Sequence, residues 1–251
     1  MSDPASCNGY ALGLALSGGG FRGVAHIGVL RTLVGHGLRP DFVAGTSAGS
    51  LIGALYASGK TADEIESVAH QISWPALLRS GRLQEFCRKY LPRTFAELEL
   101  PFRVAVTALP SWKTVMVDSG ELAPALAASC ATPYLLHRVR IGANTYTDGG
   151  WACVLPAGAC RPVCQRVIGS DVWFRAAVAR RSGLSVNGRW AKAAYSKHYL
   201  EALRQCDLAI HLRIPSVGMI PSRVGIGRLI ASGEAAAKEA LETNPRFVTS
   251  R

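Results

Sequence analysis

Apolar runs of strand length alternate with stretches of helical periodicity along most of the chain. The first predicted strand is Tyr10–Leu16, which ends in a serine and three glycines. Apolar positions at helical spacing then predict a helix over 21–37. A short strand at 41–44, a tight turn at 45–49 and a helix at 50–58 follow. This alternation predicts an α/β fold with a mostly parallel sheet covered by helices.

The rest of the chain continues the pattern. Thr61, with Glu64 three residues later, carries the signature of a capping box and predicts a helix to about Ala69. Further strands are predicted at 102–109, 114–117, 166–169 and 208–213, and further helices at 122–130 and 225–241. No repeat, low-complexity segment or linker interrupts the chain. We therefore expect one domain spanning residues 1–251.

Composition narrows the class of protein. The chain has 251 residues, of which 49% are hydrophobic, enough for a sizeable core and too many for a disordered chain. No apolar run approaches the roughly 18 to 20 residues that span a bilayer. Residues 1–8 place no basic residue ahead of an apolar core, as a secretory signal would. A cytoplasmic location is expected, with no signal peptide and no transmembrane helix.

Charge is distributed unevenly. Residues 1–160 hold 13 basic against 11 acidic side chains, whereas residues 161–251 hold 15 against 6, within a net charge of +11. A basic surface of this kind keeps a protein in solution or contacts anionic lipid headgroups or nucleic acid. No nucleic-acid motif accompanies the charge, so no nucleic-acid partner is expected. The seven cysteines form no C-x-x-C pair, so neither a metal site nor a disulfide framework is expected.

The sequence G-T-S-A-G at 45–49 lies between a predicted strand and a predicted helix. A serine nucleophile needs a sharp turn that lifts its oxygen clear of the backbone, and the flanking glycines remove the Cβ clashes of such a turn. Ser47 would then lie at a helix N-terminus, where free N–H groups favour a developing negative charge. Short motifs of small residues also arise by chance, but the strand and helix context favours a nucleophile.

A second glycine-rich segment, G-G-G-F-R-G at 18–23, joins the first strand to its helix. Successive glycines let backbone N–H groups converge on an anion, as in an oxyanion hole or a phosphate cradle. The segment also matches G-x-G-x-x-G, and Asp41 follows 18 residues after Gly23, so dinucleotide binding is an alternative. That alternative leaves the serine turn unexplained.

Ser47 needs a base, and Asp148 follows a predicted strand in the sequence D-G-G at 148–150. The same sequence is typical of an ordinary hairpin turn. A Ser-Asp-His triad is an alternative, because His198 and His211 follow Asp148 in the order found in α/β-hydrolases. Neither histidine has a distinctive local motif.

Together, these three motifs resemble the patatin-like phospholipase family in order and spacing. The serine motif follows the glycine loop by about 25 residues, and D-G-G follows the serine by about 100. Residues 128–133 look like the family's small-residue helix end before a proline, and residues 233–236 like its closing helix. The likeness covers roughly residues 10–170 and 204–242.

The resemblance implies a three-layer α/β/α fold with a mostly parallel central sheet. It implies a lipid acyl hydrolase of the phospholipase A or lysophospholipase type, with Ser47 as nucleophile and Asp148 as general base without a histidine. No metal or cofactor is needed. The segment implied for the oxyanion hole comprises Gly18, Gly19, Gly20, Arg22 and Gly23, to which the mechanism adds the backbone N–H of Ala48. Arg22 either supports this loop or binds a lipid phosphate.

Two segments depart from the family pattern. After D-G-G the family commonly has an Asn before a Pro, whereas here Trp151 begins an apolar run that leads to Pro156. This difference bears on substrate preference more than on the reaction. Residues 171–203 have no counterpart, and we interpret them as a lid or a membrane contact. An acyl-lipid substrate and a peripheral contact with anionic membrane are expected. The alternatives are a triad esterase and a non-enzymatic lipid- or nucleotide-binding module.

Overall fold

The computed structural model describes residues 9–72, 77, 82–131, 138–172, 197–215 and 222–247. The N-terminal residues 1–8, the Thr-Pro end of the motif at 128–133, and most of the expected lid at 171–203 lie outside these ranges. The strands in the described part are β1 (Tyr10–Leu16), β2 (Phe42–Thr46), β3 (Phe102–Leu109), β4 (Thr114–Val117), β5 (Val139–Ile141), β6 (Asn144–Asp148), β7 (Cys164–Asp171) and β8 (Leu208–His211).

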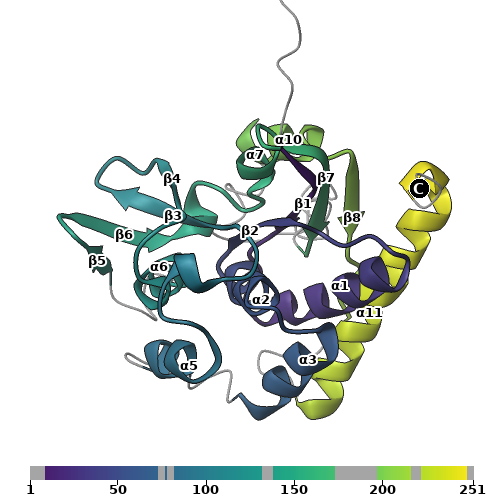
Figure 1. The fold of residues 1–251 in the computed structure, drawn as a ribbon, viewed down its shortest axis with the longest axis horizontal. Coiled ribbons are helices and arrows are strands. Elements are labelled where there is room, and N and C mark those ends of the chain that lie inside the picture. The colour runs from purple at the N-terminus through teal and green to yellow at the C-terminus, as the bar shows by residue number, and fades with distance from the viewer. Residues whose placement is uncertain are drawn as a thin grey trace, which may run out of the picture.

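The strands form a single mixed sheet in the order β5-β6-β3-β2-β1-β7-β8, with β4 paired to β3 (Figure 1). The five strands from β3 to β8 in this order are parallel to one another. Strands β4, β5 and β6 add antiparallel pairs at one end. The sheet therefore confirms the predicted mostly parallel α/β fold. Its parallel strands end at the edge where the glycine loop and the serine turn lie.

Helices cover both faces of the sheet, as Figure 1 shows. Alternate residues of β1 belong to different cores: Leu12, Leu14 and Leu16 pack with the larger group of helices, and Ala15 packs with the smaller group. The smaller group consists of α7 (Ala157–Cys160) and α10 (Lys197–Arg204). The larger group consists of α1 (Ala25–Gly35), α2 (Ala48–Ala57), α3 (Ala62–Gln71), α5 (Arg82–Tyr90), α6 (Leu122–Ser129) and α11 (Arg223–Thr243). The three-layer α/β/α architecture is confirmed.

Several predicted elements change at their ends. The helix expected over 21–37 begins as a 3₁₀ turn, η1 (Gly20–Val24), before α1. Gly20 has a φ of 56°, which bends the chain out of β1 into this turn. The capping box at Thr61 and Glu64 is present at the start of α3. Helix α5 was not predicted, although Leu83, Phe86 and Cys87 bury one helical face.

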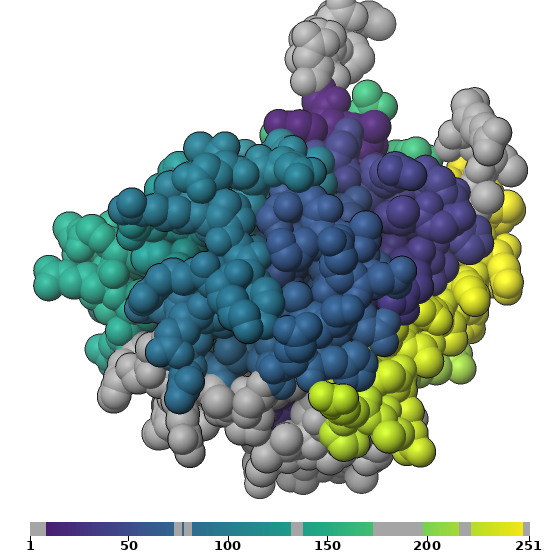
Figure 2. Space-filling view, turned by 60° about the horizontal axis from the view of Figure 1, so that its bottom comes forward, coloured from purple at the N-terminus to yellow at the C-terminus, as the bar shows by residue number. Residues whose placement is uncertain are grey.

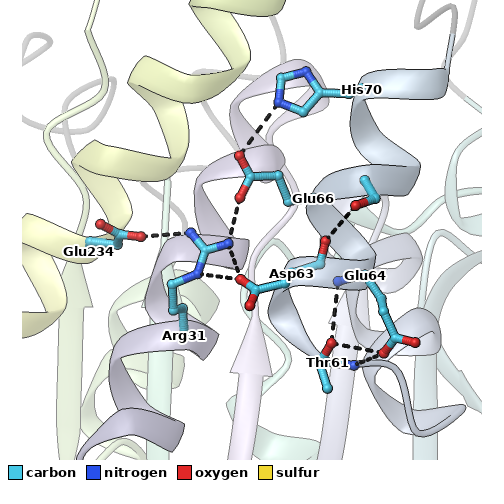
Figure 3. A network of polar contacts seen from close by, with 8 residues as sticks. Arg31, Thr61, Asp63, Glu64, Glu66, His70 and Glu234 are labelled. Carbon is cyan, nitrogen blue, oxygen red and sulfur yellow. Dashed lines mark hydrogen bonds and ion pairs between the residues drawn. The ribbon is translucent and has the colours of Figure 1, made fainter.

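Arg31 joins three helices on one side of the molecule (Figure 3). Its guanidinium lies 2.6 Å from Asp63 and pairs also with Glu66 of α3, and it lies 2.7 Å from Glu234 of α11. His70 approaches Glu66 at 3.5 Å. Arg31, Glu66 and Glu234 are partly buried, so their pairs are less screened than fully exposed ones, whereas the Asp63 side chain is 83% exposed. The closing helix implied by residues 233–236 is thus docked on α1 and α3, and Figure 2 shows α11 in yellow along this flank.

Two glycines allow α1 and α11 to touch backbone to backbone. A Cβ on Gly28 would lie 2.0 Å from the Ile230 carbonyl oxygen, and one on Gly233 would lie 1.9 Å from that of Ala25. We expect Gly28→Ala to lower the free energy of unfolding by about 1–3 kcal/mol or more, because α1 and α11 must move apart to admit the Cβ. Gly227→Ala, on the same helix pair with open space around it, should be neutral or stabilising by up to about 1 kcal/mol. Urea unfolding measures both, and equal stabilities would contradict this packing.

A helix that crosses a bilayer must be both long and apolar, and this requirement applies to the helices of the described segments. None of them offers the length together with the apolar character needed to cross a membrane.

Candidate active site

Ser47 lies on a sharp turn between β2 and α2. Its φ of 50° and ψ of −122° lie in a region that residues other than glycine rarely adopt. The two flanking glycines permit the turn, because a Cβ on Gly45 would lie 2.6 Å from the Gly49 carbonyl oxygen, and one on Gly49 would lie 2.4 Å from that of Leu16. The sequence motif therefore adopts the strained strand-to-helix geometry expected of a nucleophile turn.

Ser47 and Asp148, 101 residues apart in the chain, meet directly. The Ser47 hydroxyl donates a hydrogen bond to Oδ2 of Asp148 at 3.0 Å. The Asp148 side chain is buried, with 1% of its surface exposed, and its Oδ1 accepts the Gly150 N–H at 2.7 Å. One carboxylate oxygen is thus held by the backbone, and the other faces the serine. This distance is within the range over which a carboxylate can take a proton.

The sheet register explains why these two side chains meet. At the end of β2, Thr46 pairs with Ala105 of β3, and at the end of β6, Asp148 pairs with Val106, the next residue of β3. Gly149 makes the approach possible, because a Cβ there would lie 2.1 Å from the Ala105 carbonyl oxygen. The D-G-G sequence is not a hairpin turn, since it ends β6 and starts a 3₁₀ turn, η3 (Gly149–Trp151).

Ser129, at the end of α6, supports the serine turn and was not singled out by the sequence analysis. Its hydroxyl accepts the Ser47 backbone N–H at 2.8 Å and donates to the Ala105 carbonyl at 2.7 Å. The neighbouring Cys130 is buried next to the Ser47 and Ser50 hydroxyls, and burial, together with the Asp148 charge, raises the pKa of its thiol. Cys130 therefore stays protonated. The small-residue helix end at 128–133 carried a signal that could have identified both residues.

The glycine loop approaches the serine turn. A Cβ on Gly18 would lie 3.4 Å from that of Ser47, and one on Gly23 would lie 2.5 Å from that of Ala48. The Gly18 N–H donates to the Val154 carbonyl at 2.9 Å, so it is not available to a substrate. The Arg22 N–H donates to the Gly19 carbonyl at 3.3 Å. Within the described ranges, the backbone N–H groups of Gly19, Gly20 and Ala48 have no acceptor.

The contacts of Asp41 and of two histidines bear on two alternatives, dinucleotide binding and a Ser-Asp-His triad. Asp41 precedes β2, at the opposite edge of the sheet from the glycine loop, and its carboxylate accepts the N–H groups of Ala11 and Leu12, each at 2.8 Å. It is therefore not placed to bind the ribose of a dinucleotide. The Ser47 hydroxyl reaches Asp148 with no imidazole between them. His211 Nδ1 lies 3.2 Å from Oδ2 of Asp171, and the exposed His198 lies on α10.

A pocket of about 200 Å³ opens beside the Asp148 loop. Its lining includes Gly150 and Cys153 of the segment after Asp148, Met116 of β4, and His198 and Tyr199 of α10. Trp151 packs edge to face on the half-exposed Trp112, with ring centroids 6.0 Å apart. The pocket therefore lies where the chain leaves Asp148, beside α7 and α10, and neither Ser47 nor Asp148 is among the described residues that line it.

Known proteins resemble parts of this chain in sequence. A patatin-like phospholipase domain-containing protein of Caenorhabditis elegans is 46% identical over 88 residues, 35% of this chain and 6% of that protein. An uncharacterized NTE family protein of Mycobacterium tuberculosis is 29% identical over 160 residues, 57% of this chain and 43% of that protein. The lysophospholipase NTE1 of Yarrowia lipolytica is 56% identical over 50 residues, 20% of this chain and 4% of that protein. The chain thus spans less than half the length of these relatives.

Solved structures share the fold at low sequence identity. VipD from Legionella pneumophila aligns with a TM-score of 0.60 at 12% identity, over 94% of this chain and 67% of its own. The type III effector protein ExoU aligns with a TM-score of 0.52 at 13% identity, over 96% of this chain and 53% of its own. Residues 14–160, more than half of the chain, match the family described as patatin-like phospholipase. The chain therefore belongs to the patatin-like phospholipase family.

Proposed function

We propose that this protein is a lipid acyl hydrolase that cleaves carboxylic esters through Ser47 and Asp148. The observation that carries the proposal is the 3.0 Å hydrogen bond from the Ser47 hydroxyl to the buried Asp148 carboxylate. The strained φ of Ser47 supports it, because backbone strain of this kind gathers at functional sites. Membership of the family and the name of the Yarrowia lipolytica relative, a lysophospholipase, favour an ester of a lipid as substrate.

The reaction takes two steps at these atoms. Asp148 takes the Ser47 proton while the serine oxygen bonds to the ester carbonyl carbon, and the carbonyl oxygen becomes an oxyanion. The tetrahedral intermediate then expels the alcohol, which takes the proton from Asp148, and leaves an acyl group on Ser47. In the second step Asp148 takes a proton from water, the water oxygen attacks the acyl carbon, and Ser47 leaves with the proton.

The oxyanion needs donors that are not already engaged. We assign this role to the backbone N–H groups of Gly19, Gly20 and Ala48, the last at the N-terminus of α2. Gly18 and Gly23 serve the site differently. Gly18 donates to Val154, and Gly23 lets the loop pack against Ala48. Of the five loop residues implied for the oxyanion hole, we therefore keep two, Gly19 and Gly20, as donors.

Arg22 lies on the same loop with an exposed side chain. Its guanidinium carries a fixed charge and a donor geometry that suits a phosphate. We therefore assign Arg22 to the headgroup of a phospholipid substrate and not to support of the loop. The net charge of +11 favours approach to an anionic membrane in the same way.

Labelling by a fluorophosphonate probe tests this function on the unmodified protein. Such probes phosphonylate a serine only where a base and oxyanion donors activate it. We expect one modified peptide, with the label mapped to Ser47 by mass spectrometry, and competition by a lysophospholipid. Exposed Ser67 of α3 should stay unlabelled. Label on another serine, or none at all, would refute the assignment of Ser47.

A further inference from the structure

His26 is a buried histidine outside the serine and aspartate pair. It lies in the first turn of α1, with 0% of its surface exposed. Its Nε2 is 2.9 Å from the Ser17 carbonyl oxygen, and its Nδ1 is 2.7 Å from the Ser170 hydroxyl. Ser17 and Ser170 are fully buried as well. The ring therefore connects the residue that follows β1 to the residue before the last of β7, at the start of the glycine loop.

These contacts define which ring nitrogen carries the proton. A carbonyl oxygen only accepts hydrogen bonds, so Nε2 must donate to Ser17, and Nδ1 must accept from the Ser170 hydroxyl. Burial lowers the pKa of His26 to about 4, although the Ser17 bond and the charge of Asp171 act in the opposite direction. Asp171 is itself buried and bonded to Tyr199 and His211. At neutral pH, His26 is thus an uncharged donor with a single tautomer.

Two hydrogen bonds hold the peptide unit between Ser17 and Gly18, one at its carbonyl and one at its N–H. The Ser17 carbonyl accepts from His26, and the N–H of the same peptide unit, on Gly18, donates to the Val154 carbonyl at 2.9 Å. A peptide unit is planar, so two bonds on opposite sides define its orientation. Ser17 is further tied by its N–H to the Ser170 carbonyl and by its hydroxyl to the Val172 N–H, each at 3.0 Å.

The two glycines that follow this peptide unit are held differently. Gly19 packs against Val172, since a Cβ on Gly19 would lie 2.2 Å from a valine methyl carbon, and its carbonyl accepts the Arg22 N–H. Gly20 begins η1 with a φ of 56° and has open space where a Cβ would lie. Glycine backbones sample many conformations unless neighbours restrain them. Stabilisation of an oxyanion depends on donors that are oriented before the reaction begins. The orientation of the Ser17–Gly18 peptide unit therefore sets the direction in which the backbone enters Gly19 and Gly20, and with it the direction of their N–H groups.

We propose that His26 is a positioning residue for the oxyanion hole: its Nε2–H bond to the Ser17 carbonyl orients the loop that presents the N–H groups of Gly19 and Gly20. The inference rests on the proposed hydrolase function. The ring nitrogens of His26 bond Ser17 and Ser170, not Ser47 or Asp148. His26 acts through the backbone of the loop.

Two substitutions test the Nε2–H donor of His26 separately from the rest of the imidazole ring. In His26→Gln the side-chain amide reaches the position of Nε2 and can still donate to Ser17, whereas in His26→Asn it reaches only the position of Nδ1. We expect His26→Asn to lower kcat for p-nitrophenyl butyrate by about 10²-fold with KM within about twofold, because misplaced donors act on the transition state. His26→Gln should restore kcat to within about tenfold of wild type. His36→Asn, at the other end of α1, is the matched control and should be unchanged.

Equal kcat for folded His26→Asn and wild-type protein would overturn the inference, since a purely structural histidine affects stability alone. A measurement on the unmodified protein covers the case in which His26→Asn does not fold. Nitrogen-15 NMR of the ring should show a neutral histidine protonated at Nε2 from pH 5 to pH 9. A proton on Nδ1 would show that the Ser17 carbonyl is not bonded and would refute the role of His26.

The outcomes also separate this inference from the proposed function. Failure of wild-type protein to hydrolyse any ester or to label at Ser47 refutes the hydrolase and, with it, an oxyanion role for the loop. Wild-type activity with an unaffected His26→Asn variant refutes only the role of His26. As a second readout, the amide resonances of Gly19 and Gly20 should shift in His26→Asn and return toward wild type in His26→Gln. Unshifted resonances would contradict the orienting bond.

Discussion

Exchanging Ser47 for alanine is expected to lower the rate of ester hydrolysis by roughly 10⁴-fold or more, to the level that binding alone provides. The hydroxyl that reaches Asp148 at 3.0 Å is lost, and the described thiol nearest to it, Cys130, is held protonated by burial and cannot replace it. Initial rates with p-nitrophenyl butyrate and with a lysophospholipid measure the effect. Circular dichroism checks that the fold persists.

Ser58→Ala provides a matched control, because Ser58 follows the last residue of the same helix, α2, and its hydroxyl donates to the Leu55 carbonyl and accepts from the Lys60 ammonium. Ser47→Gly adds a second readout. It should be equally inactive but more stable than Ser47→Ala, since glycine tolerates a φ of 50° without strain. Substantial turnover by either Ser47 variant would exclude Ser47 as the nucleophile.

Exchanging Asp148 for asparagine is expected to lower kcat by about 10²–10⁴-fold, the usual contribution of a general base. Asparagine keeps the size of the side chain and can still accept the Gly150 N–H, but its amide cannot take the Ser47 proton. KM should change little, because the carboxylate is buried beside the serine and does not face the bulk of a substrate. Initial rates over a range of substrate concentrations separate kcat from KM.

His198→Gln and His211→Gln serve as controls that distinguish a pair from a triad. His198 is exposed on α10, and His211 bonds Asp171, so both variants should keep most of the wild-type kcat. If either histidine variant lost turnover while Asp148→Asn retained it, a Ser-Asp-His triad would be the correct mechanism and the direct serine–aspartate pair would be wrong.

The elements near the site were predicted well because their signals are local. Strand β1 and its glycine stop, the capping box at Thr61, and the serine turn each depend on neighbours within a few residues. Elements without a strong local signal were missed or shortened. Helix α5 has a buried face of only Leu83, Phe86 and Cys87. Strand β7 extends two residues before and two residues beyond the predicted strand at 166–169, where polar residues obscure the apolar pattern.

The sequence predicted the two reacting side chains of the candidate site, but not the hydrogen bonds that hold the site together. Ser47 and Asp148 could be named from their motifs, whereas Ser129 and His26 could not. Ser129 bonds Ser47, which is 82 positions away, and His26 is held between Ser17, 9 positions away, and Ser170, 144 positions away. The glycine loop was expected to donate from several residues, but Val154, from a distant loop, takes the Gly18 N–H. Which amides stay free depends on the partners that the fold brings to them.

The amino-acid sequence alone determined the alternation of strands and helices, the turn on which Ser47 lies and the family to which the chain belongs. The elements and the turn follow from steric and hydrophobic preferences that act over a few residues, and the family follows from the resemblance of three motifs in order and spacing. Only the tertiary structure decided that β2 and β6 end at neighbouring residues of β3, that Asp41 is occupied by the backbone of β1, and that His26 lies under the glycine loop. Such contacts arise from sheet register and packing, which join segments that carry no information about one another locally.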